Sequence, residues 1–207
     1  MFLSKLTLDP RHPQARRDLA NAYEMHRTLA RAFAADAKTP PTRFLWRLER
    51  RGDLQSSSVV LVQSVQAADW SGLNTHPGYA EKIESNKAVN LEKLVQPNAR
   101  YRFRLLANPT VTREGKRYGL TREEEQLEWL SRQGMRHGFS LLGCTRGADE
   151  RLQVEQGRGG NRITLHTALF EGVLQADSPE ALRQGVINGF GHGKALGLGL
   201  LSLARLA

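Results

Sequence analysis

The 207-residue chain contains a single cysteine, Cys144, so no disulfide can form within it. Zinc sites need several Cys or His ligands at short, regular spacing, and the six histidines are scattered without that spacing. Cys144 closes an apolar run that begins at Phe139, which favours a core position over a role as nucleophile. We therefore expect neither a metal site nor a cofactor held by thiolates.

Long apolar runs are also missing. No segment approaches the roughly 18 consecutive apolar residues that a membrane-spanning helix needs. The opening residues, Met1 to Lys5, do not have the layout of a secretory signal peptide. These two absences predict a cytoplasmic protein that does not contact a membrane.

Negative charge is scarce relative to positive charge. Lys and Arg total 30 against 21 Asp and Glu, which gives a formal net charge of +9. Such an excess favours a polyanionic partner, for which nucleic acid and an anionic membrane surface are the candidates, and of these we expect nucleic acid. The length is enough for one large domain or two small ones.

One helix carries the candidate reactive side chains. Asn21 followed by Glu24 has the spacing of a capping box, which predicts a helix that runs to about residue 36. At about 100° per residue, Met25 and Leu29 face the core. The polar flank and its boundary then hold Tyr23, His26, Arg27 and Arg31.

The other elements of the first half follow from hydrophobic patterning. We expect strands at 2–8, 44–48 and 59–62, a basic connection at 10–20, a weak helix at 69–73, and at most one short strand within 74–98. The order β-α-β-β-(α)-(β) is that of a ferredoxin-like fold.

The second half repeats this order. Residues 100–105 alternate strictly, with Arg102 and Arg104 on one face and apolar side chains on the other. The further expected elements are a basic loop at 110–119 with Lys116 and Arg117, a helix opened by a Thr121–Glu124 capping box and ended by Gly134 or Gly138, a strand at 139–144, a β-hairpin with Arg158 and Arg162 at its tip, a strand at 167–174, a helix from Ser178-Pro179, and a last strand at 200–206.

The predicted fold is therefore α+β, with two tandem ferredoxin-like (βαββαβ) domains. We expect the first at 1–90, a linker at 91–98 and the second at 99–207.

A glycine-rich stretch precedes the last strand. Five glycines in the thirteen residues from Gly189 to Leu201 expose bare backbone N–H groups, and Lys194 adds a positive charge. Gly191, His192 and Gly193 lie beside that lysine. The spacing fits neither a Walker loop nor a dinucleotide fingerprint. The stretch is either an anion-binding loop or simply a turn before a buried strand.

Tyr23 and His26 are three residues apart in the first turns of the predicted helix, where the helix dipole favours an anion. A metal-free cleavage of RNA would suit them, because the ribose 2′-OH can attack the adjacent phosphate and a histidine transfers protons near neutrality. The alternative is a histidine that merely packs at the edge of the core.

Four segments together resemble one known family: 23–29, 102–109, 170–172 and 193–202. The family is CasE, the repeat-processing CRISPR endoribonucleases of type I-E Cascade. The resemblance implies cleavage of precursor CRISPR RNA at the 3′ foot of the repeat stem-loop without a metal, which leaves a 5′-hydroxyl and a 2′,3′-cyclic or 3′ phosphate. The protein would then stay on the guide RNA beside other Cascade subunits.

Carried over by position, His26 is the acid/base residue, Tyr23 is its partner, and Arg27 and Arg31 lie near the scissile phosphate. Alanines stand at 30 and 34, where some relatives have serine. Lys194 and its glycines resemble the RNA-holding loop of the family, and Arg158 and Arg162 lie in the region of its groove-inserting hairpin.

Two other functions stay open from the residues alone. One is a non-catalytic subunit that holds an RNA stem-loop. The other is an acyltransferase that uses the glycine-rich stretch to bind the pyrophosphate of coenzyme A.

Overall fold

The computed structural model describes residues 1–34, 36, 39–49, 58–147, 150–155, 160 and 162–206. The chain forms two compact units. The first unit comprises Met1–Val89, Val154–Ile163 and Ala195–Gly197, and the second comprises Asn90–Gln153, Thr164–Lys194 and Leu198–Ala207. The predicted domain boundaries, with a linker at 91–98, stay a prediction.

The first unit is built on a four-stranded antiparallel sheet with the order β2-β3-β1-β4. Its strands are β1 (Phe2–Leu8), β2 (Phe44–Glu49), β3 (Ser58–Ser64) and β4 (Ala80–Ala88). The three strands expected from patterning are confirmed. The fourth strand, β4, is longer than expected. Every third residue of this edge strand is half-buried and the others are exposed, so its sequence does not show the alternation that identifies a strand.

The helices of this unit are α1 (Pro13–Ala20), α2 (Ala22–Ala30) and two short 3₁₀ helices, η1 (Arg31–Phe33) and η2 (Trp70–Thr75). The prediction of an irregular connection at 10–20 is wrong. Pro13 begins α1, as proline does readily at a first helical position. Asp18 is buried in α1 and accepts a hydrogen bond within the helix from Gln14 Nε2 (2.8 Å) and one from the Tyr79 hydroxyl (3.0 Å), which ties the helix to the residue before β4.

Helix α2 begins as predicted, but only half of its capping box forms. The Asn21 Oδ1 accepts from the Tyr23 N–H at 3.0 Å. The Asn21 N–H bonds to carbonyls of α1 instead of to Glu24. The helix ends at Ala30 and tightens into η1 up to Phe33, so it is shorter than the predicted run to residue 36.

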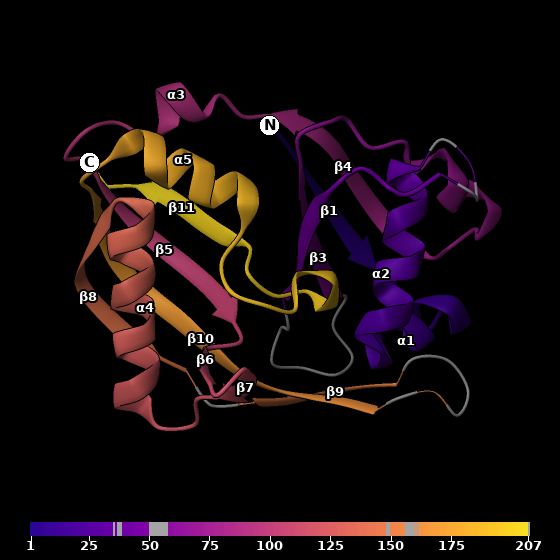
Figure 1. Ribbon diagram of the computed structural model, residues 1–207. Helices are drawn as coiled ribbons and strands as arrows, with labels where there is room; N and C mark the ends of the chain where they lie inside the picture. The colour runs from indigo at the N-terminus through magenta and orange to yellow at the C-terminus, as the bar shows by residue number, and fades with distance from the viewer. Residues whose placement is uncertain are drawn as a thin grey trace. The chain divides into compact units, whose positions relative to one another are not determined.

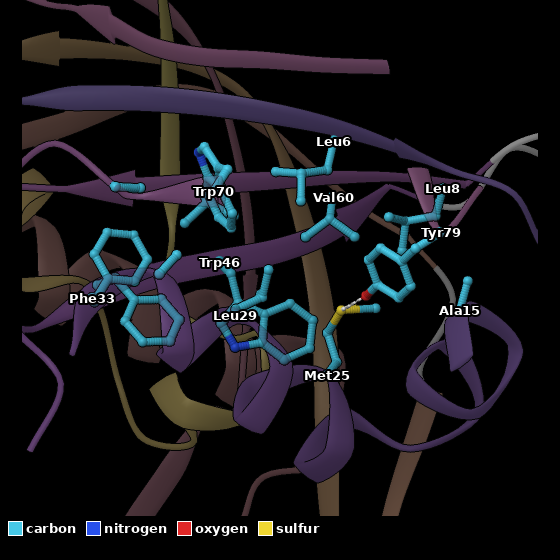
Figure 2. Packing of buried hydrophobic residues seen from close by; sticks show 14 residues of the cluster. Leu6, Leu8, Ala15, Met25, Leu29, Phe33, Trp46, Val60, Trp70 and Tyr79 are labelled. Carbon is cyan, nitrogen blue, oxygen red and sulfur yellow. Dashed lines mark hydrogen bonds between the residues drawn. The ribbon is translucent and has the colours of Figure 1, made fainter. Parts of the chain in front are cut away.

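One hydrophobic cluster joins helices and sheet in the first unit (Figure 2). Met25 and Leu29 of α2 point at the strands, as the helical spacing predicts, and the Tyr79 hydroxyl contacts the Met25 sulfur at 3.9 Å. Phe33 stacks on Phe44, with ring centroids 4.6 Å apart. The face of α2 opposite to its polar side chains is therefore fixed by packing.

The second unit has a sheet with the order β11-β5-β10-β8, and β9 pairs with β10 outside that path. Its strands are β5 (Arg100–Ala107), β8 (Phe139–Arg146), β9 (Glu150–Glu155), β10 (Arg162–Ala176) and β11 (Leu201–Arg205). Helices α4 (Glu123–His137) and α5 (Pro179–Asn188) lie on one face of this sheet (Figure 1), and α3 (Leu91–Leu94) precedes it.

Both main sheets follow one plan. Numbered within its own unit, each has the strand order fourth, first, third, second, with antiparallel neighbours. The predicted α+β fold with two tandem ferredoxin-like units is confirmed. In the first unit the 3₁₀ helix η2 stands where the second unit has α5.

Two expectations about the second unit are wrong. Residues 110–119 are a β-hairpin, β6 (Thr110–Arg113) and β7 (Lys116–Gly119), because Glu114 (φ 50°) and Gly115 (φ 73°) form the tight left-handed turn that hairpins favour. Thr121 does not cap α4, which begins at Glu123 with no side-chain cap bond. Gly138 ends α4 in a left-handed conformation (φ 70°), as one of the two predicted ends.

Candidate functional site

The side chain of His26 is half-buried on α2, at the edge of the core. Its ring lies almost parallel to that of Phe44, with centroids 5.0 Å apart and planes 15° apart. The Nδ1 atom is buried and has no hydrogen-bond partner among the described residues. Phe44 therefore packs on one face of the imidazole, and the burial of Nδ1 makes Nε2 the better candidate for proton exchange.

Burial lowers the pKa of His26 below its ordinary value, because the charged form loses hydration. Protonation would also place a second N–H at the buried Nδ1, where the described residues offer it no acceptor. Both effects favour the neutral imidazole at neutral pH.

The neighbouring arginines of α2 differ in their surroundings. Arg27 donates to Glu24 at 3.1 Å, and Arg17 of α1 approaches the same carboxylate at 3.3 Å. Glu24 thus ties the two helices together beside Tyr23, which is half-buried. Arg31 is exposed at the start of η1. The structure places Tyr23, His26 and Arg27 on α2 and Arg31 directly after it, so the four predicted residues share one short segment.

The glycine-rich stretch is a well-defined loop. Gly191 (φ 70°) and Gly193 (φ 80°) adopt left-handed conformations that other residues rarely take. A Cβ at Gly193 would lie 2.8 Å from Leu198 Cδ1, so side chains are also excluded by space. The Lys194 Nζ donates to the Gly191 carbonyl at 2.6 Å. Lys194, Gly191 and Gly193 therefore stabilise the conformation of this loop.

The end of this loop belongs to the first unit. There the Trp46 Nε1 donates to the Ala195 carbonyl at 3.3 Å, and a Cβ at Gly197 would lie 2.9 Å from the Trp46 ring. Asn21, the cap of α2, donates from Nδ2 to the Glu155 carbonyl at 3.0 Å in the same unit.

Other predicted binding residues gather in the second unit. Lys116 and Arg117 lie exposed on β7. The pKa of His192 is lowered first by burial and then by the charges of Arg117 and Lys194, which shows that these three side chains share one region.

Arg102 and Arg104 lie on a different surface of the second unit. They line a shallow depression of about 440 Å³ on the face of β5, where Arg104 approaches Glu171 at 3.5 Å. Arg162 is exposed at the beginning of β10. Arg158 lies outside the described residues.

Metal ligands do not gather in the part of the chain that the structure describes, where no group of three His, Cys, Asp or Glu could hold an ion. Of the described helices, none has the length and apolar character that crossing a bilayer requires.

Sequence reasoning missed Phe44 as a neighbour of His26. Strand alternation shows that Phe44 and Trp46 face the same side, but it does not show which helix residue they meet. Arg17 was missed because α1 was missed.

The comparisons with known proteins agree with this geometry. Residues 1–205 match the family model described as CRISPR associated protein. The chain is 40% identical to the CRISPR-associated endoribonuclease Cse3 of Thermus thermophilus, over 99% of this chain and all of that one. It is 30% identical to the CRISPR system Cascade subunit CasE of Escherichia coli, over the whole length of both. A structure of CRISPR endoribonuclease Cse3 bound to a 19-nucleotide RNA matches with a TM-score of 0.88 and 40% identity, covering 99% of this chain and all of that one.

Proposed function

Because this chain belongs to the Cse3/CasE family of CRISPR-associated proteins, we propose that it is an endoribonuclease that binds the stem-loop of CRISPR repeat RNA. It cleaves at the 3′ foot of the stem and remains on the product as a subunit of Cascade. The relatives are named as an endoribonuclease and as a Cascade subunit, and one related structure holds RNA. A protein that processes CRISPR RNA would act in the cytoplasm, which is the location that we propose.

The observation that carries the chemistry is the environment of His26. A neutral imidazole that stacks on Phe44 and buries Nδ1 has the form that a general base needs, with Nε2 as the proton-accepting nitrogen. The 2′-OH of the nucleotide before the scissile bond gives its proton to Nε2, and the 2′-oxygen attacks the phosphorus. The bond from phosphorus to the 5′-oxygen breaks.

The step balances in protons. The imidazolium that forms when Nε2 takes the 2′-OH proton returns a proton to the leaving 5′-oxygen, so the products are a 2′,3′-cyclic phosphate and a 5′-hydroxyl and His26 is again neutral. In the transition state, the Tyr23 hydroxyl and the guanidinium groups of Arg27 and Arg31 stabilise the charge on the phosphorane oxygens. No metal is part of the proposal, because a histidine and cations supply the proton transfer and the charge.

The glycine loop supports RNA binding better than the acyltransferase alternative. It follows α5 and leads to β11, so it does not connect a strand to the N-terminus of a following helix as pyrophosphate-binding loops do. We propose that Gly191, His192, Gly193 and Lys194 contact the RNA backbone. Arg102, Arg104, Lys116, Arg117, Arg158 and Arg162 are the further proposed RNA contacts.

The test is incubation with the repeat RNA of the host in EDTA, under single-turnover conditions. Wild-type protein should cut once, and His26→Ala should be slower by about 100-fold or more, the usual contribution of general acid–base catalysis. Its affinity for the stem-loop should stay within a few-fold.

His76→Ala is the matched control, since it removes another imidazole of the first unit at the end of η2. It should cleave at the wild-type rate. Uncut RNA with wild-type protein would instead support the non-catalytic RNA-binding alternative.

A further inference from the structure

The second unit contains a groove that the cleavage chemistry does not use. Its volume is about 740 Å³, and it lies between β6, the exposed side of α4 and the glycine loop. Its cationic and imidazole side chains are Arg113, Arg132, Arg136, His137, His192 and Lys194.

The charge in this groove is only partly compensated. Glu125 and Glu128 also line it, and Glu128 Oε2 lies 3.5 Å from Arg132 Nη1. Arg113 and Arg136 are exposed and take part in no ion pair with any described residue. The groove therefore keeps positive charge that solvent or a bound anion must balance.

Helix geometry orients this charge along a line. Arg132 and Arg136 are four residues apart on α4, about 6 Å along the helix axis, so both project from one side. Arg113 of β6 belongs to another wall of the same groove. Cations on separate walls suit a chain of phosphates better than one compact anion, because consecutive charges can each meet one cation.

Two imidazoles of the groove lie close to these cations. The pKa of His137 is lowered first by burial and then by Arg136 and Lys194. The pKa of His192 is lowered first by burial and then by Arg117 and Lys194. The charged groups around them are Glu125, Glu128, Arg113, Arg132 and Arg136 in the groove wall, with Arg117 on β7.

We propose that this groove extends the RNA contacts of the glycine loop, and that it holds consecutive phosphates of the RNA backbone through Arg113, Arg132 and Arg136. This rests on the proposed function in that the polyanion is RNA. The backbone comes either from a strand of the repeat stem or from the single-stranded RNA beside it, and both present the same phosphodiester chemistry. The site contributes affinity and register, and no part of the bond cleavage.

The test measures equilibrium binding in the His26→Ala background, so that the RNA stays uncut. Two probes are used, the repeat stem-loop alone and the stem-loop with its single-stranded flanks. The groove variant is Arg132→Ala with Arg136→Ala. Lys93→Ala with Arg205→Ala removes two exposed cations from elsewhere in the second unit and is the matched control.

The groove variant should bind at least one probe roughly tenfold more weakly at moderate salt. The slope of log K against log salt should fall by about 1.5, because each lost phosphate contact is worth roughly 0.7 to 0.9. Loss with both probes identifies the stem as the source of the phosphates, and loss with the flanked probe alone identifies the single strand. Arg113→Ala, on a different element, should lower the slope by about half as much, which tests the site even if the helix variant unfolds.

Two outcomes overturn the proposal: unchanged affinity and slope for both groove variants, or an equal loss in the control, which would show only an effect of net charge. Failure of the proposed function gives a different result. In that case wild-type protein leaves the repeat RNA uncut, whatever the groove variants do to binding.

Discussion

The two regions of interest place histidine in opposite surroundings. His26 of the first unit packs against an aromatic ring, and burial is the cause of its lowered pKa. His137 and His192 of the second unit line an open groove, where cations add to the effect of burial. Burial is therefore the first cause of the lowered pKa of all three histidines, and only in the groove do neighbouring cations add to it.

The difference shows what each region is suited to do. A group that transfers protons must have a fixed position, and the first unit supplies this through the core beneath α2. A surface that binds the phosphates of an RNA backbone needs positive charge and not tight packing, and the exposed arginines of the second unit supply this charge. Variants in the first region should change rate and stability, and variants in the groove should change affinity and its dependence on salt.

Phe44→Ala should produce the largest effect. The ring of Phe44 is buried and stacks on both His26 and Phe33. Its loss leaves a cavity under the imidazole, and we expect the free energy of unfolding in urea to fall by about 3–5 kcal/mol. Arg136→Ala, in the groove, should change it by less than about 0.5 kcal/mol.

Phe44→Leu separates packing from position. It keeps apolar volume and a folded protein, but it removes the flat surface on which the imidazole rests. At saturating RNA its single-turnover rate constant should fall while RNA affinity stays close to that of the wild type. A wild-type rate for this variant would show that the ring is not needed to position His26.

Changes of pH should move the two regions in opposite directions. Because the pKa of His26 is lowered, cleavage at subsaturating RNA should begin to fall at a lower pH than it would with an unburied histidine, and should approach a tenfold loss per pH unit below the lowered pKa. RNA affinity should instead rise as the pH falls, since His137 and His192 become protonated beside phosphate.

Stability should follow His26 with the same sign as the rate. The folded pKa lies below the unfolded one, so the unfolded chain binds more protons between the two values. The contribution is complete above about pH 6.5 and is lost as the pH falls toward the folded value.

A cleavage rate that increases on acidification through this range would assign His26 the role of acid and contradict that of base.

Most of the helices and strands could be predicted from the sequence, because strict alternation of polar and apolar residues is a local signal that can be recognised without knowledge of the tertiary fold. Residues 100–105 and 2–8 alternate, and both became strands. Helix α1 escaped because the three arginines and two prolines of residues 10–17 are typical of a loop, and the burial of Asp18 against Tyr79, which holds the helix, depends on the tertiary fold. The hairpin at 110–119 escaped because both of its strands are short and mostly polar.

The candidate site was accessible in part. The spacing of Tyr23, His26 and Arg27 places them on one helix, which the structure confirms, while their roles stay a prediction. The stacking on Phe44 depends on a pairing between helix and strand that no local pattern encodes. The groove was missed for a similar reason, since Arg113 and Arg136 come from elements that only the tertiary fold brings to one surface.

The smallest effect, and the finest test of the contrast, comes from one substitution made in both regions. Glu128→Gln removes an exposed carboxylate that lies 3.5 Å from Arg132, so RNA affinity in the groove should rise by roughly two- to fivefold, the range for an exposed ion pair. Glu24→Gln should act oppositely, because Glu24 is largely buried and holds both Arg17 and Arg27, so the protein should lose stability without a gain in affinity. Anisotropy titrations and urea unfolding of both variants measure the two effects. Tighter RNA binding by Glu24→Gln, or an unchanged RNA affinity of Glu128→Gln, would contradict the contrast between a packed cleavage centre and an electrostatic groove.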